Sequence, residues 1–128
     1  MSKGPVISIV EDDAAVRAAM ENLVKSLGFD VYTFASAQEF LESQCVAMTA
    51  CLISDVQMPM MSGIELQTAL VERGFQIPMI FVTAILDPLV KRRAMDAGAV
   101  GFLNKPCHGK ALLQLIQDAI RLGGRKAE

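Results

Sequence analysis

Short apolar runs alternate along the chain with longer stretches in which apolar residues recur every three or four positions. The short runs are rich in β-branched residues and predict five strands, at residues 6–10, 31–34, 51–54, 79–82 and 101–103. The first, third and fourth runs are almost continuously apolar, as in central strands of a parallel sheet that is covered on both faces. The second run carries more polar residues, which favours an edge position.

The stretches between the strands have the period of helices that pack on one side. They predict helices at 15–27, in the segments that follow Ser36 and Ser62, at 89–97 and at about 110–122. Asp13, Ser36 and Ser62 are residue types that cap helix N-termini, and Pro88 stands at a natural first helical position. Gly28 is expected to end the first of these helices, and the pair Gly123-Gly124 the last.

This order of strands and helices argues for an open α/β sheet with helices on both faces. A chain of 128 residues has room for one domain of ordinary size. We therefore assign residues 1–122 to the domain and residues 123–128 to a tail or the start of a linker. In such sheets a functional site lies beyond the carboxyl ends of the strands.

Charge and composition narrow the classes of partner. Twelve basic and fourteen acidic side chains give a net charge of −2, so a field that attracts nucleic acid or an anionic membrane is not expected. No apolar run approaches the ~18 residues of a spanning helix. Three cysteines, Cys45, Cys51 and Cys107, cannot all pair within the chain, which is typical of buried thiols in a reducing compartment. We expect a cytoplasmic protein.

Polar residues follow four of the five predicted strands. Glu11, Asp12 and Asp13 come after the first, Asp55 after the third, Thr83 after the fourth, and Lys105-Pro106 after the fifth. Clustered carboxylates repel one another unless a proton or a cation lies between them, and oxygen ligands without thiolates favour Mg²⁺. A metal, an amine and a hydroxyl around a carboxylate are what formation of an acyl phosphate requires.

Four segments carry a resemblance to a known family. They are Val10-Glu11-Asp12-Asp13, the stretch 53–63, Val82-Thr83-Ala84, and the stretch 97–106 that ends in Lys105-Pro106. In order and spacing, over residues 5–122, they resemble the receiver domain of bacterial two-component response regulators, and the last stretch resembles regulators of the nitrogen-fixation and quorum-sensing type. The resemblance implies a flavodoxin-like, doubly wound (βα)5 parallel sheet with strand order 2-1-3-4-5.

The resemblance also implies roles for individual residues. Asp55 would accept a phosphoryl group from a histidine kinase. Mg²⁺ would be held by Asp12, Asp55, the backbone carbonyl of Gln57 and, through a water, Glu11. Lys105 would pair with the phosphoryl oxygens, Thr83 would move to bond one of them, and Phe102 would be the switch aromatic; these last three sit in the stretches quoted above. Asp13 is better explained as a helix cap.

Further details of the resemblance concern the loops around the site. Gln57 and Ile85 would flank the path of the attacking water, and Ile85 should crowd it, which predicts a long-lived phosphoryl group. The Lys105-Pro106 bond would be cis. Ser54 and Cys107 stand where the family usually has apolar residues and phenylalanine, respectively.

The expected partners follow from the same resemblance. They are a histidine kinase or phosphotransfer protein, and an output domain or partner protein that contacts the surface made by residues 89–97, 101–103 and 110–122. The resemblance also implies a homodimer that forms on phosphorylation. The domain would be a switch rather than an enzyme, because it transfers and hydrolyses only its own phosphoryl group.

Two other classes share parts of the pattern. A flavodoxin-like carrier needs small and hydroxyl residues in its first loop, where Glu11-Asp12-Asp13 would repel a phosphate. A phosphatase of the haloacid dehalogenase type also forms an aspartyl phosphate, but on a residue that follows the first strand. The carboxylate that becomes modified, Asp55 or one after the first strand, distinguishes the receiver domain from the phosphatase.

Overall fold

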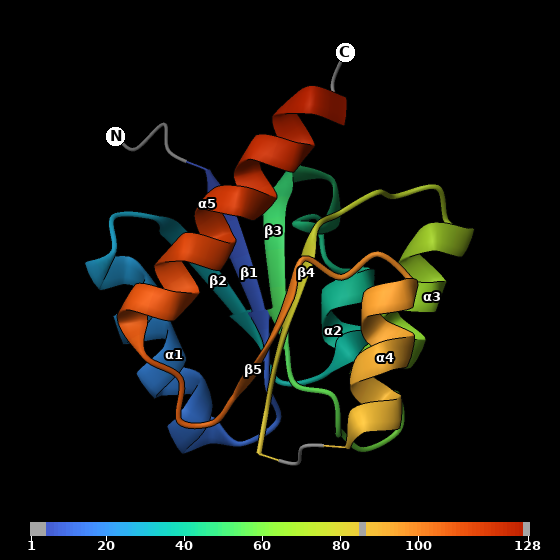
Figure 1. The fold of residues 1–128 in the computed structure, drawn as a ribbon, viewed down its shortest axis with the longest axis horizontal. Helices are drawn as coiled ribbons and strands as arrows, with labels where there is room; N and C mark the ends of the chain where they lie inside the picture. Colours follow the sequence, from blue (N-terminus) through green and yellow to red (C-terminus); the bar gives the residue numbers. More distant parts are fainter. Residues whose placement is uncertain (1–4, 85–86, 127–128) are drawn as a thin grey trace.

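Five parallel strands form one sheet in this computed structural model, which describes residues 5–84 and 87–126 (Figure 1). The strands are β1 (Val6–Val10), β2 (Asp30–Phe34), β3 (Thr49–Ser54), β4 (Met79–Thr83) and β5 (Gly101–Asn104). Their order is β2-β1-β3-β4-β5, and each neighbouring pair is parallel. The predicted fold class and strand order are confirmed.

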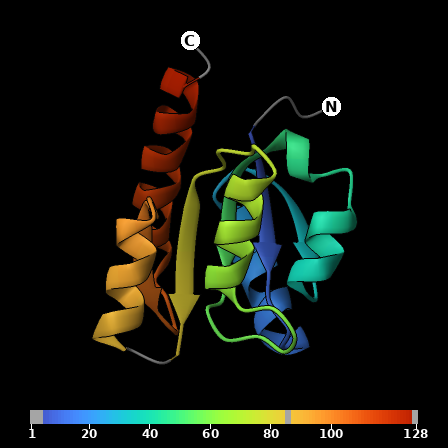
Figure 2. The same cartoon turned by 90° about the vertical axis from the view of Figure 1, so that its right-hand side faces the viewer.

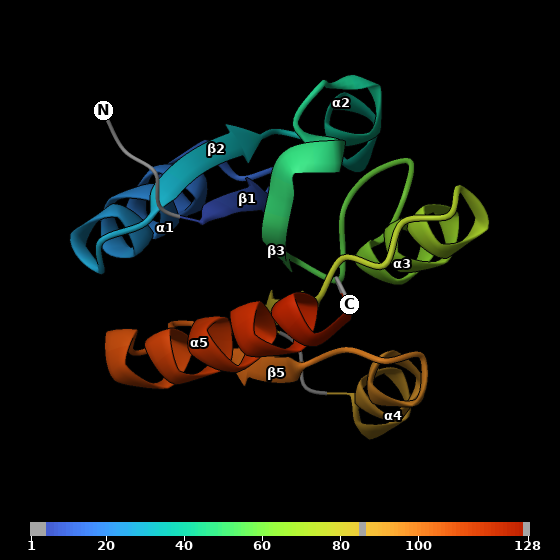
Figure 3. The same cartoon turned by 90° about the horizontal axis from the view of Figure 1, so that it is seen from above.

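Helices cover both faces of this sheet. They are α1 (Ala14–Ser26), α2 (Ala37–Glu42), α3 (Gly63–Glu72), α4 (Pro88–Asp96) and α5 (Gly109–Lys126), together with the short 3₁₀ helix η1 (Val46–Met48). One buried apolar cluster joins α1 and α5 to one face, and a second joins α2, α3 and α4 to the other. The view from above shows the two helical layers on either side of the strands (Figure 3).

Successive side chains of the central strands point to opposite faces of the sheet and so belong to different apolar clusters. On β3, Cys51 and Ile53 pack toward α1 and α5, whereas Leu52 packs toward α2 and α3. All three side chains are at most 1% exposed, as predicted for a strand that is covered on both faces. In β2, by contrast, Tyr32 is 44% exposed, and the strand lies at the edge of the sheet, as its polar residues indicated.

The predicted helix starts are confirmed by hydrogen bonds. The Asp13 carboxylate accepts from the backbone N–H groups of Ala15 and Val16, and the Ser36 hydroxyl accepts from that of Glu39. Ser62 and Glu65 form a reciprocal capping box at the start of α3. Each cap satisfies N–H groups that the first helical turn leaves unpaired, so these polar residues fix where the helices begin.

The predicted end of the last helix is wrong. Gly123-Gly124 does not stop α5, which continues to Lys126. A glycine inside a helix costs only about 1 kcal/mol relative to alanine. The buried side chains of Leu112, Ile116 and Ala119 hold the body of α5 on the sheet, so the helix is already nucleated when it reaches the glycines.

The carboxyl ends of the strands point to one edge of the sheet, at the lower side of Figure 2. The loop between β3 and α3 lies at this edge, and the chain segments that follow β1, β4 and β5 begin there. Because the sheet is parallel, residues that lie far apart in the sequence meet at this edge.

Candidate functional site

Three carboxylates meet where the carboxyl ends of the strands lie. We call this region, with Glu11, Asp12 and Asp55, the acidic edge. Glu11 and Asp12 directly follow β1, and Asp55 directly follows β3, its neighbour in the sheet. One oxygen from each side chain lies within 4.8 Å of the others. Glu11 and Asp55 are 4% and 9% exposed, whereas Asp12 is exposed to solvent. The predicted acidic cluster is therefore present, with two members buried and one open to ligands.

Lys105 bridges the two buried carboxylates. Its Nζ donates to Glu11 Oε1 at 2.7 Å and to Asp55 Oδ2 at 2.9 Å. Burial lowers the pKa of Lys105, but the hydrogen bonds to Glu11 and Asp55 outweigh burial and raise it above its ordinary value. Burial also raises the pKa of Glu11, and the bond to Lys105 only partly offsets this. The Lys105 ammonium thus neutralises part of the negative charge of the cluster.

The backbone around Asp55 is fixed on both sides. Its N–H donates to the carbonyl oxygen of Val10 at 3.2 Å, and its own carbonyl oxygen accepts from the Ser54 hydroxyl at 2.8 Å. Asp55 Oδ1 also accepts from the Gln57 N–H at 3.3 Å. These bonds leave the carboxylate with a defined direction, toward Lys105 and the other acidic residues.

Gly63 packs directly against this backbone. A Cβ atom added at Gly63 would overlap with the carbonyl oxygen of Asp55 and meet the Phe81 ring at 2.9 Å. The start of α3 approaches the end of β3 so closely only because residue 63 has no side chain. Gly63 lies in one of the four segments that carry the resemblance, but the reason for a glycine at this position is visible only in three dimensions.

Thr83 and Phe102 lie on the neighbouring strands β4 and β5, where Thr83 pairs with Asn104 and Phe102 pairs with Phe81. Thr83, the last residue of β4, is 2% exposed, and its carbonyl oxygen accepts from the Lys105 N–H at 2.9 Å. Phe102 on β5 is half-buried, and its ring centroid lies 6.1 Å from that of Phe81. The switch roles that the resemblance implies for these two residues stay predictions.

Several of the remaining residues singled out in the sequence lie around the acidic edge or at helix ends. Asp13 is a helix cap, as expected, and the Lys105-Pro106 peptide bond is cis. Gln57 is exposed beside Asp55, whereas Ile85 lies outside the described residues. Cys107 is half-buried, and its Sγ lies 3.8 Å from the sulfur of Met20, while all three cysteines are free thiols.

The residues of the acidic edge fit a hard divalent cation. They offer carboxylate oxygens from Glu11, Asp12 and Asp55, which are ligands of the type that Mg²⁺ prefers. One lysine cannot neutralise three carboxylates, so the cluster retains negative charge that a cation would balance. Exposed Asp12 leaves an approach from solvent.

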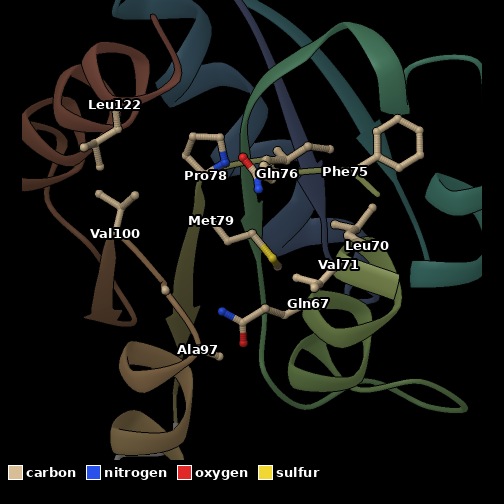
Figure 4. A pocket seen from close by; sticks show the side chains of 12 residues that line it. Gln67, Leu70, Val71, Phe75, Gln76, Pro78, Met79, Ala97, Val100 and Leu122 are labelled. Atoms are coloured by element: carbon tan, nitrogen blue, oxygen red, sulfur yellow. The ribbon is translucent and has the colours of Figure 1, made fainter. Parts of the chain in front are cut away.

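A separate cavity of about 220 Å³ lies at the other end of the sheet (Figure 4). It opens beside Met79 at the start of β4 and Val100 just before β5, with Leu122 of α5 and Val71 of α3 on its walls. None of its lining residues carries a charge. This cavity therefore lacks the groups for acid, base or metal chemistry, and the acidic edge is the candidate site.

Comparisons with known proteins identify the family of the chain. Residues 7–117 match the family described as the response regulator receiver domain. Nodulation protein W of Bradyrhizobium diazoefficiens is 38% identical over 123 residues, which are 96% of this chain and 54% of that protein. Response regulator protein TmoT of Ectopseudomonas mendocina is 42% identical over 123 residues, 96% of this chain and 56% of its own. The chain thus spans about half the length of these relatives.

Solved structures show the same fold. The structure of the response regulator StyR superposes with a TM-score of 0.89 at 42% identity, covering 97% of this chain and 63% of that one. The crystal structure of FixJ-N gives a TM-score of 0.83 at 31% identity, covering 94% of this chain and 96% of that one. Among the described residues, no helix is long and apolar enough to cross a membrane. With its parallel sheet, acidic edge and bridging lysine, the chain belongs to the receiver domain family of two-component response regulators.

Proposed function

We propose that the domain accepts a phosphoryl group from a histidine kinase onto Asp55 in a Mg²⁺-dependent reaction, and that this changes its conformation to control an output. The observation that carries the proposal is the position of the Asp55 carboxylate. It lies 2.9 Å from the Lys105 ammonium and within 4.8 Å of two further carboxylates. A nucleophilic oxygen is thereby placed beside both a fixed cation and a set of metal ligands.

In the proposed transfer, an Asp55 oxygen attacks the phosphorus of a phosphohistidine. The bond between phosphorus and the imidazole nitrogen breaks, and the imidazole leaves with its electron pair. Mg²⁺, held by Asp12, Asp55, the Gln57 carbonyl and a water on Glu11, would neutralise charge on the phosphoryl oxygens. Lys105 would turn from the carboxylates toward one of those oxygens, because its ammonium already lies at the site and is protonated at neutral pH.

Thr83 and Phe102 are the proposed switch. The Thr83 hydroxyl would bond a phosphoryl oxygen, and Phe102 would turn inward to occupy space that Thr83 leaves. Phe102 has no polar atom that would lose a hydrogen bond on burial, so the inward state has no such cost. Its half-buried position next to Phe81 supports the proposal, since the ring already contacts the core layer beneath α4.

The proposed partners are a histidine kinase or phosphotransfer protein on one side and an output domain or partner on the other. Relatives of about twice this length are described as response regulators, which supports an output linked to the receiver domain. The surface formed by α4, β5 and α5 is the proposed contact for the output and for a homodimer linked to phosphorylation. Phe102 is a residue of β5 and so belongs to this surface, which a turn of its ring would alter directly.

Reaction with a small phosphodonor in the presence of Mg²⁺ tests the proposal. Intact-mass measurement should show one phosphoryl group per chain, and peptide mapping should place it on Asp55. The Asp55→Asn variant should take up none, whereas Asp13→Asn, which alters only a helix cap, should be modified normally. A label on a residue after β1, as in the phosphatase class, or no label on the folded protein would contradict the proposal.

A further inference from the structure

The hydroxyl of Ser54, buried directly beneath the acidic edge, has a specific partner. Ser54 is 1% exposed and is the last residue of β3. Its Oγ donates to the carbonyl oxygen of Asp55 at 2.8 Å. This bond involves neither the acidic side chains nor Lys105. It joins a buried side chain to the backbone of Asp55, whose carboxylate is the proposed nucleophile.

The Asp55 carbonyl needs a donor because of where the sheet ends. Pairing between β3 and β4 stops at Ser54 and Phe81, so the Asp55 carbonyl lies one residue beyond that ladder. The Cα of Gly63 closes off the same oxygen, since a Cβ there would overlap with it. A backbone carbonyl packed in this way loses free energy if it has no donor. The Ser54 hydroxyl supplies the donor.

This bond also determines how the Asp55 carboxylate is presented. The N–H of Asp55 is held by Val10, and its carbonyl is held by Ser54, so the peptide planes on both sides of its Cα have fixed orientations. The next peptide leads to Gln57, whose N–H holds Asp55 Oδ1 at 3.3 Å. A rotation of the Asp55 carbonyl would therefore move both the carboxylate and the Gln57 backbone.

We infer that Ser54 is a positioning residue for phosphoryl transfer: its hydroxyl bond to the Asp55 carbonyl aligns the Asp55 carboxylate with the incoming phosphorus. The inference rests on the proposed function and adds a residue that the family resemblance identified only as a departure. Ser54 is not one of the proposed metal ligands, and its hydroxyl bonds the Asp55 carbonyl rather than a group of the acidic cluster. It acts through the backbone, and small misplacements of a nucleophile change reaction rates strongly.

The sheet offers a matched control in Ser8. This residue in the middle of β1 is also fully buried, and its hydroxyl bonds that of Thr49, the first residue of β3, at 2.7 Å. Loss of either hydroxyl removes one buried hydrogen bond from the sheet. Only the loss at Ser54 affects the backbone of Asp55. If the Ser54 hydroxyl only stabilises the fold, the two variants should change the rate of phosphorylation equally. If it positions Asp55, the Ser54 variant alone should slow the reaction.

The test measures the maximal rate of phosphorylation at saturating small phosphodonor and Mg²⁺ for the wild type, Ser54→Ala, Ser54→Thr and Ser8→Ala. We expect Ser54→Ala to be about tenfold slower, Ser54→Thr to recover to within about threefold of wild type, and Ser8→Ala to react normally although it is less stable. If Ser54→Ala does not fold, Ser54→Cys, whose thiol is a weak donor, takes its place and should be slowed in the same way.

Unchanged rates in the folded Ser54 variants, or equal slowing by Ser8→Ala, would overturn the inference. So would a Ser54→Thr variant that is folded and as slow as Ser54→Ala. These outcomes differ from a failure of the proposed function, in which the wild-type protein itself takes up no phosphoryl group on Asp55.

Discussion

The Lys105 ammonium lies 2.7 Å from a Glu11 carboxylate oxygen, closer than its 2.9 Å contact with Asp55. In this state, the lysine that would bind a phosphoryl oxygen is occupied by two carboxylates. A cation held by Asp12, Asp55 and, through a water, Glu11 would take over part of this neutralising role and release Lys105 for the substrate. Metal binding and the availability of the lysine would then be linked through Glu11 and Asp55, the two carboxylates that Lys105 contacts.

The first prediction concerns the metal. Asp12→Ala should weaken Mg²⁺ binding at least tenfold, because the exposed carboxylate is the ligand that a solvated cation reaches first. A magnesium titration followed by NMR measures the affinity, and the residues after β1 and β3 should shift first. The control is Asp13→Ala, which removes the cap of α1 and should cost about 1 kcal/mol of stability without changing the affinity. Equal affinities for wild type and Asp12→Ala would contradict the assignment.

The second prediction concerns pH. The pKa of Lys105 is raised in the folded state, so its pairing stabilises the fold fully below the ordinary pKa of 10.5 and less as pH rises through the folded value. The free energy of unfolding of the wild type should therefore fall more steeply above pH 10.5 than that of Lys105→Met. Urea unfolding across this range measures the difference.

Lys25→Met serves as the control for this pH experiment. Lys25 pairs with Glu21 at the surface, where ion pairs contribute little. The slope of stability against pH for this variant should match that of the wild type. A Lys105→Met slope equal to both would show that the buried pair does not contribute to alkaline stability.

The third prediction concerns the switch. With beryllofluoride bound, Thr83 should move toward Asp55 and Phe102 should turn further inward, next to Phe81. Shifting a population from 1:99 to 99:1 requires about 5.5 kcal/mol, and one charge-assisted hydrogen bond from Thr83 supplies only part of it. Thr83→Ala should therefore still bind beryllofluoride but convert incompletely, as measured by NMR shifts of α4 and β5. Identical Thr83 and Phe102 positions with and without beryllofluoride would rule the mechanism out.

The fourth prediction concerns close packing under the site. Gly63→Ala should lower the free energy of unfolding by about 3 kcal/mol, because the new Cβ meets backbone rather than a movable side chain. Gly109→Ala is the matched control, since its Cβ would only touch the end of the Leu23 side chain at 3.1 Å. Chemical denaturation of both variants should give a large loss for the first and a change below about 1 kcal/mol for the second. Similar losses would show that helix starts tolerate both substitutions equally.

Much of this structure could be predicted from sequence for identifiable physical reasons. The apolar run of β3 and the caps Ser36 and Ser62 are local signals, and they located strands and helix starts well. The meeting of Asp55 with Glu11 followed from the geometry of parallel sheets. The end of α5 was wrong because the glycine signal is local, whereas the packing of α5 on the sheet is not.

Other features of the site depend on distances that a sequence does not contain. The sequence indicated that Lys105 would lie at the acidic edge, but not that its ammonium would bridge Glu11 and Asp55. Ser54 was noticed as an unusual residue, yet its bond to the Asp55 carbonyl required the observed side-chain direction. The close approach of Gly63 to that carbonyl belongs to the same class of feature.

The two ion pairs of Lys105 join residues that are 94 and 50 positions apart in the sequence. A ribosome has therefore made nearly the whole domain before the site can exist, because β5 must be added beside β4 to bring the lysine to the edge. Contacts of such long range also form late in folding, since chain closure must precede them. Only a chain that has completed its fold could then accept a phosphoryl group, and the kinase would not phosphorylate incomplete chains.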